Sequence, residues 1–87
     1  MKKNLDQWEY LDTRIRRVII FVDFIEAMKA MNLIALIAEK YNHHPDWSNT
    51  YNKLDISLQT HTKKNVTELD YTVAEEINKL VKENFGI

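Results

Sequence analysis

The sequence predicts an α+β fold, in which two long helices pack on one face of a four-stranded antiparallel sheet. Residues 23–41 and 67–85 carry apolar side chains at helical spacing. Residues 15–21 are rich in β-branched residues, and residues 51–60 alternate between apolar and polar residues, as strands do. The elements follow one another as strand, strand, helix, strand region and helix, which favours an antiparallel sheet with its helices on one side.

Length and composition are those of one small globular domain over residues 1–87. The sequence has no cysteine, which excludes disulfides and thiolate metal sites, and its net charge of -1 does not indicate direct nucleic-acid binding. The longest apolar run, residues 33–38, is too short to span a membrane, and no signal peptide is visible. We therefore expect a cytoplasmic protein, and its small core makes oligomerisation a reasonable expectation.

Two short strands are expected near the N-terminus. Residues 1–7 are polar and are expected to be frayed or to form a short turn of helix. Trp8 and Tyr10 begin the first strand, residues 12–14 form a polar break, and residues 15–21 form the second strand. These two strands are predicted to pair as an antiparallel hairpin.

The first long helix begins after Asp23, because Glu26 follows at capping-box spacing. It ends near residues 42–44, where Asn42 can adopt the left-handed conformation and Pro45 disfavours helical geometry at His44. One face is predicted from the spacing of Phe24, Ala27, Met28, Met31, Ala35 and Ala38. Further apolar residues widen this surface, so the helix either packs against both its own sheet and a partner subunit or is deeply buried.

The second half of the chain is predicted to hold a strand region and the last helix. Leu54, Ile56 and Leu58 point to one face of a strand over residues 51–60, and residues 48–50 either extend that strand through a bend or form another. The last helix starts at Thr67, with Asp70 at capping-box spacing and Gly86 as the C-cap. Its predicted face consists of Leu69, Val73, Ile77, Leu80 and Asn84, with Val66, Ala74 and Val81 beside it.

The histidines are the candidate chemical groups. His43 and His44 stand side by side at the predicted helix end, and His61 follows the strand. If the helix reaches His43, Glu39 shares its face, while His44 is turned away. Imidazoles with a nearby carboxylate are suited to general acid–base chemistry. Flat side chains at Trp47 and Tyr51 would suit a flat heteroaromatic ligand.

Each candidate also has a simpler structural explanation. A histidine after a helix is commonly a surface residue, Asp70 at its spacing is most simply a helix cap, and Trp47 and Tyr51 are commonly core or sheet-edge aromatics. Glu39, His43, His44 and His61 are all potential zinc ligands. Because adjacent histidines rarely bind one ion with both rings and no HExxH motif is present, a metal site is disfavoured.

The spacing Glu39-x3-His43-His44-Pro45-x5-Tyr51-x9-His61-x8-Asp70 resembles the signature of the pterin-4a-carbinolamine dehydratases. The similarity extends over roughly residues 8–81. It implies dehydration of 4a-hydroxytetrahydrobiopterin to quinonoid dihydropterin, which recycles the pterin cofactor of aromatic amino acid hydroxylases. It implies no metal and no organic cofactor.

The resemblance also implies roles for particular residues. His43, His44 and His61 are the catalytic set: His43 and His61 are the acid–base pair, and His44 mainly holds the pterin. The residues expected to bind or orient the substrate are Glu39, Asp70, Pro45, Trp47 and Tyr51.

The same resemblance implies a homodimer or homotetramer. An alternative role is that of a dimerisation or transcriptional cofactor acting through protein contact at helix 23–41. Three features depart from the family pattern: only seven residues precede Trp8, where relatives usually have another helix; Leu69 replaces a common Arg, which fits Leu69 facing the core; and residues 62–65 lack glycine.

Overall fold

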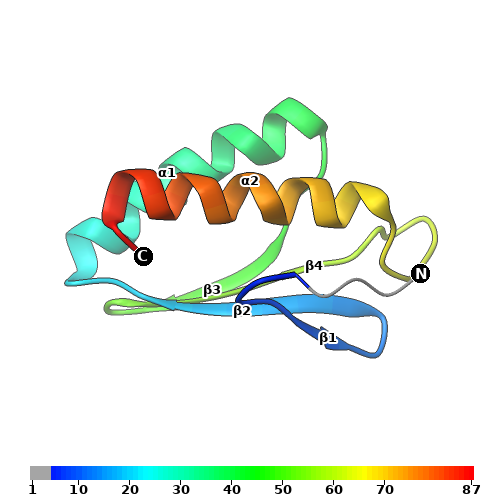
Figure 1. The fold of residues 1–87 in the computed structure, drawn as a ribbon, viewed down its shortest axis with the longest axis horizontal. Coiled ribbons are helices and arrows are strands. Elements are labelled where there is room, and N and C mark those ends of the chain that lie inside the picture. The colour runs from blue at the N-terminus through cyan, green and yellow to red at the C-terminus, as the bar shows by residue number, and fades with distance from the viewer. Residues whose placement is uncertain (1–4) are drawn as a thin grey trace.

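Both helices cover one face of a single four-stranded antiparallel sheet (Figure 1). The structure is a computed structural model and describes residues 5–87. Its elements are β1 (Glu9–Leu11), β2 (Arg14–Ile20), α1 (Phe24–Tyr41), β3 (Asp46–Thr50), β4 (Lys53–Leu58) and α2 (Glu68–Phe85). The strand order is β1-β2-β4-β3, so the predicted fold class is confirmed. The expectation for residues 1–7 falls in part on residues 1–4, outside the described residues; Asp6 and Gln7 form a turn.

The sheet is built around β2 and β4, which pair from Ile15 opposite Leu58 to Ile20 opposite Lys53. The predicted hairpin is confirmed, since β1 pairs antiparallel with β2. The alternation predicted for β4 is also confirmed: Leu54, Ile56 and Leu58 are fully buried on the face that the helices cover. Within residues 5–87, no helix covers the opposite face of the sheet (Figure 1).

Helix α1 is capped as the sequence predicts, but its buried face is different. Asp23 Oδ1 accepts a hydrogen bond from the Glu26 amide at 2.9 Å, and Asn42 closes the helix with a φ of 49°. The buried residues are Ala27, Ala30, Ile34, Ile37 and Ala38, whereas Phe24 and Met28 of the predicted face are exposed. Because α1 is apolar on most of its circumference, periodicity alone did not identify the stripe that packs inward.

Strands β3 and β4 form a hairpin of two separate strands. Tyr51 lies in the turn between them with a φ of 52°, so the prediction that a strand begins at Tyr51 was wrong. The Asn49 side chain holds this turn by donating to the carbonyl oxygens of Tyr51 and Lys53. These local side-chain bonds favour the tight turn over an extended chain.

Helix α2 packs its predicted apolar face inward. Val73, Ala74, Ile77 and Val81 are buried, and Leu69 and Leu80 pack against the core, but Asn84 of the predicted face is exposed. Gly86 is the C-cap, with a φ of 69°. The two helices are also joined by polar contacts, because Glu76 accepts hydrogen bonds from the Tyr41 hydroxyl and the Lys40 ammonium.

Four chain segments meet at one end of the molecule. The end of α1 leads into β3 there, and the end of β4 leads into α2 (Figure 1). This convergence brings residues 42–46 next to residues 59–70. No helix within residues 5–87 is long and apolar enough to cross a bilayer.

Candidate active site

His43 is the first residue beyond the cap of α1. The left-handed Asn42 turns the chain, and the His43 amide then donates to the Ala38 carbonyl at 2.9 Å. Pro45 and the start of β3 follow at once. Helix termination therefore aims the His43 side chain inward, and His43 is only 8% exposed.

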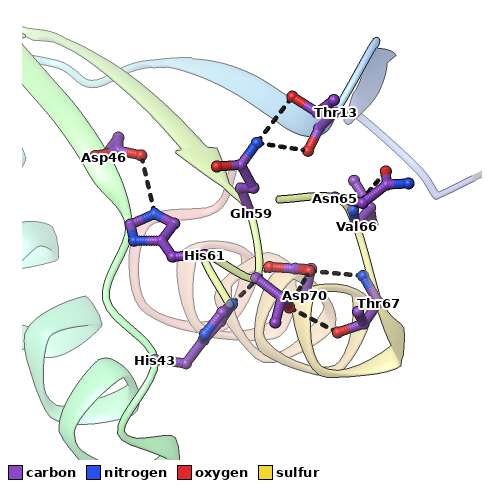
Figure 2. A network of polar contacts seen from close by, with 10 residues as sticks. Thr13, His43, Asp46, Gln59, His61, Asn65, Val66, Thr67 and Asp70 are labelled. Carbon is purple, nitrogen blue, oxygen red and sulfur yellow. Dashed lines mark hydrogen bonds and ion pairs between the residues drawn. The ribbon is translucent and has the colours of Figure 1, made fainter. Parts of the chain in front are cut away.

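A buried carboxylate holds the His43 ring. Nε2 of His43 lies 2.5 Å from Oδ1 of Asp70, whose side chain is fully buried (Figure 2). The other oxygen, Oδ2, accepts hydrogen bonds from the Thr67 amide and the Thr60 hydroxyl, each at 2.8 Å. The sequence left open whether Asp70 is a helix cap or a site residue, and in the structure it makes both kinds of contact.

These contacts determine which nitrogen of His43 carries the hydrogen. An ionised carboxylate only accepts hydrogen bonds, so Nε2 donates to Asp70. In the neutral ring Nδ1 is then left as the proton acceptor. The Thr60 hydroxyl donates to Asp70, so the Thr67 hydroxyl, 2.7 Å away, donates to the Thr60 oxygen. The result is a chain of hydrogen bonds that fixes the orientation of the His43 ring.

His44 and Glu39 form a second pair, at the surface. His44 Nε2 lies 2.6 Å from Glu39 Oε2, and both side chains are more than half exposed. The shared helix face of Glu39 and His43 required the helix to reach His43; α1 instead ends at Tyr41 and the chain then turns, so the two side chains do not pair. Glu39 therefore reaches His44, while His43 turns toward Asp70.

His61 comes from the chain beyond β4. It follows Thr60, which forms an isolated bridge with Asn65 across a short turn. Its Nε2 lies 3.6 Å from Asp46 Oδ2, and its side chain is largely exposed. The ring is thus accessible, with one carboxylate beside it.

A pocket of about 310 Å³ brings all three histidines together. Its lining also includes Gln59, Thr60 and Leu69, together with Asn42 and Thr62. Leu69, which packs against the core, therefore also faces the pocket. A larger cavity of about 500 Å³ lies on the open face of the sheet and contains none of the histidines.

The other predicted site residues lie at varying distances from this pocket. Glu39 and Asp70 do not line the pocket, but each contacts a histidine that does. Pro45 connects His44 to β3. Trp47 packs against the core, and Tyr51 lies at the turn at the far end of the β3–β4 hairpin. The structure does not bring Tyr51 to the histidines.

Several lining residues were not among the predicted site residues: Asn42, Gln59, Thr60, Thr62 and Leu69. Thr60 follows Leu58 by two residues, and side chains at this spacing point to the same face of a strand. The sequence therefore contained a signal that Thr60 faces the helices. No three His, Asp or Glu side chains among residues 5–87 are grouped so that they could hold a metal ion.

With the fold and the histidine pocket described, the chain can be compared with known proteins. Residues 1–80 match the family model described as pterin 4 alpha carbinolamine dehydratase. A Prochlorococcus marinus protein named for this dehydratase is 52% identical over 73 residues, which are 84% of this chain and 76% of that protein. A Brucella ovis protein with the same name is 45% identical over 78 residues, 87% of this chain and 80% of that protein.

A solved structure shows the same fold. The Brucella melitensis protein described as a transcriptional coactivator/pterin dehydratase superposes with a TM-score of 0.83 at 43% identity. The match covers 86% of this chain and 82% of that one. The chain belongs to the pterin-4a-carbinolamine dehydratase family. Its activity is that of a 4a-hydroxytetrahydrobiopterin dehydratase, a lyase that serves pterin cofactor recycling.

Proposed function

We propose that the dehydration takes place in the histidine pocket, with His43 and His61 as the acid–base pair. The observation that carries this proposal is the bond between His43 and buried Asp70, in a pocket that His61 also lines. One imidazole is firmly oriented by the protein, and the other is accessible to solvent. Both are within the same cavity, as a two-proton reaction requires.

The reaction needs one proton supplied and one removed. The C4a–O bond of the substrate breaks, and the hydroxyl leaves as water after it gains a proton from an imidazolium. The N5 proton passes to a neutral imidazole, and the C4a–N5 bond becomes double, which gives quinonoid dihydropterin. One ring loses a proton and the other gains one, so together they carry as many protons after the reaction as before it. Each well-placed acid or base contributes roughly 10²–10⁴-fold to such a rate.

His44 and its partner Glu39 are proposed to hold the pterin at the mouth of the pocket. Both are exposed, and His44 lines the cavity. Asp70 orients His43 and does not itself touch the substrate, because it is fully buried behind the ring. Pro45 and Trp47 support this corner by turning the chain into β3 and packing it on the core.

A coupled assay tests this assignment. An aromatic amino acid hydroxylase generates the 4a-carbinolamine, and its absorbance decays faster when the dehydratase is added. The variant with both His43→Ala and His61→Ala should abolish the acceleration. Asn32→Ala, a change on the exposed surface of α1, is the matched control and should leave it intact. Full acceleration by the double variant would refute the assignment.

A second role through protein contact is favoured by the surface of α1. Phe24, Ile25, Met28 and Leu36 are exposed on this helix, although all four are apolar. Exposed apolar side chains grouped on one element commonly mark contact surfaces. We propose that this surface joins copies of the chain into a homodimer or homotetramer, and that it can instead take a helical protein partner, as a dimerisation or transcriptional cofactor would.

Light scattering during size-exclusion chromatography tests the contact. Leu36→Glu should lower the oligomeric mass, since a charge would be buried without a partner. Glu75→Lys, an exposed charge change on α2 and not on α1, is the control. An unchanged mass for Leu36→Glu would exclude this surface from the oligomer.

A further inference from the structure

Gln59 lines the histidine pocket with an amide group that the protein holds in one orientation. Its Nε2 donates to the Thr13 carbonyl at 3.1 Å and to the Thr13 hydroxyl at 2.8 Å (Figure 2). A backbone carbonyl can only accept, so the nitrogen of the amide must face Thr13. Both of its hydrogens are therefore engaged.

The carbonyl oxygen of Gln59 is left as a free acceptor. In Figure 2 it points away from Thr13, toward the side on which His61 and Asp46 lie. Within residues 5–87, no donor forms a hydrogen bond with this oxygen, and it is not among the buried polar atoms that lack a partner. It is thus open to solvent at a pocket wall.

The buried carboxylate beside the pocket is already engaged, because Asp70 Oδ1 and Oδ2 bind His43, Thr60 and the Thr67 amide. At the mouth of the pocket, one oxygen of Glu39 binds His44. The pyrimidine half of a pterin carries an amino group and ring N–H groups, which need acceptors when the ring is removed from water. Gln59 offers such an acceptor beside the histidines.

We propose that Gln59 is a specificity-determining residue, whose carbonyl oxygen accepts a hydrogen bond from an N–H group of the pterin ring. Thr13, on the turn between β1 and β2, acts as a positioning residue by fixing the amide. This inference rests on the proposed function of the pocket. It predicts an effect on binding of the ring, and none on the proton transfers.

Equilibrium binding of dihydrobiopterin, followed by its fluorescence, tests the inference together with steady-state kinetics. Gln59→Leu removes the acceptor at similar size, and Gln59→Met is the second substitution in case Leu does not fold. A lost hydrogen bond costs about 0.5–1.5 kcal/mol, so Kd and KM should rise about 2–10-fold. The value of kcat should stay within about twofold, as expected when binding of ground state and transition state weakens equally.

Thr13→Ala provides a graded comparison. It removes only the hydroxyl contact and keeps the backbone carbonyl, so its Kd should rise less than that of Gln59→Leu. In the double variant, the two effects should not add, because both act through the same amide.

The alternative is that Gln59 only ties the end of β4 to the β1–β2 turn. A Kd within twofold of the parent protein would overturn the inference, whether or not the urea midpoint falls. So would a fall in kcat at unchanged Kd. Failure of the proposed function is a separate result: the unaltered protein would then not bind dihydrobiopterin, or the double histidine variant would still catalyse dehydration.

Discussion

His43 Nε2 lies 2.5 Å from Asp70 Oδ1, and the second oxygen of the same carboxylate accepts the Thr67 amide at the start of α2. One buried side chain thus joins the end of one helix to the start of the other. The helix cap and the proposed catalytic residue His43 are parts of the same hydrogen-bond network, so a change at Asp70 should act on both stability and catalysis.

Asp70→Asn should lower kcat by roughly 10²–10⁴-fold. The amide can donate to Nε2 of His43 and so favour the tautomer in which Nδ1 carries the hydrogen, which removes the acceptor. Nitrogen chemical shifts of the His43 ring would report this change. Asp23→Asn is the control: it changes the N-terminal cap of α1, at the helix end remote from the pocket, and should keep its activity. An Asp70→Asn enzyme with kcat within twofold of the parent would contradict the role given to the carboxylate.

Thr60→Val should destabilise the protein by about 1–3 kcal/mol, because it leaves a buried carboxylate oxygen without one of its donors. The value of kcat should fall as well, since Asp70 is held less firmly against His43. Thr60→Ser keeps the hydroxyl and should restore most of both. Urea unfolding and single-turnover kinetics measure the two effects. Equal behaviour of the Val and Ser variants would show that the hydroxyl does not matter.

His44→Ala should raise KM more than it lowers kcat, because His44 is proposed mainly to hold the pterin. The free energy of unfolding should change by less than about 1 kcal/mol, since the His44–Glu39 pair is exposed. Glu39→Gln tests the partner in the same two measurements. If His44→Ala lowers kcat as far as His43→Ala does, His44 takes part in the chemistry itself.

Glu76 should give the protein a stability that is lost in acid. The hydrogen bond from Tyr41, followed by contacts with Lys40, lowers the pKa of Glu76 below its ordinary value of 4.5, although burial opposes this. A lowered folded-state pKa stabilises the protein above the unfolded pKa, and this contribution disappears as the pH falls through the folded-state pKa.

The comparison with Glu76→Gln isolates that contribution, because other carboxyl groups titrate alike in both proteins. Urea unfolding should show a larger difference in unfolding free energy at neutral pH than in acid below the folded-state pKa of Glu76. A difference that stays constant across this range would show that the charge of Glu76 is not responsible.

The features that could be predicted from the sequence are those determined locally. Asp23 begins α1, and Asn42 and Gly86 close α1 and α2, as expected, because each acts on a backbone within a few residues of itself. The parity of Leu54, Ile56 and Leu58 likewise follows from strand geometry alone. The order of these elements then leaves few sheet arrangements.

The features that could not be predicted depend on distant partners. The buried stripe of α1 is chosen by the sheet and α2, which lie far away in the sequence. The exchange of partners, by which Glu39 binds His44 and His43 binds Asp70, follows from the helix ending at Tyr41 and from the position of α2. The contact of Gln59 with Thr13 spans 46 residues and has no local signal.

A structure of the protein with dihydrobiopterin bound tests the central claim most directly. The account predicts that the pterin ring lies in the pocket between His43 and His61, with ring nitrogens of both histidines within about 3 Å of the N5 and C4a region or linked to it by one water. A pterin found instead in the cavity on the open face of the sheet, beside Arg14 and Arg16, would contradict the account.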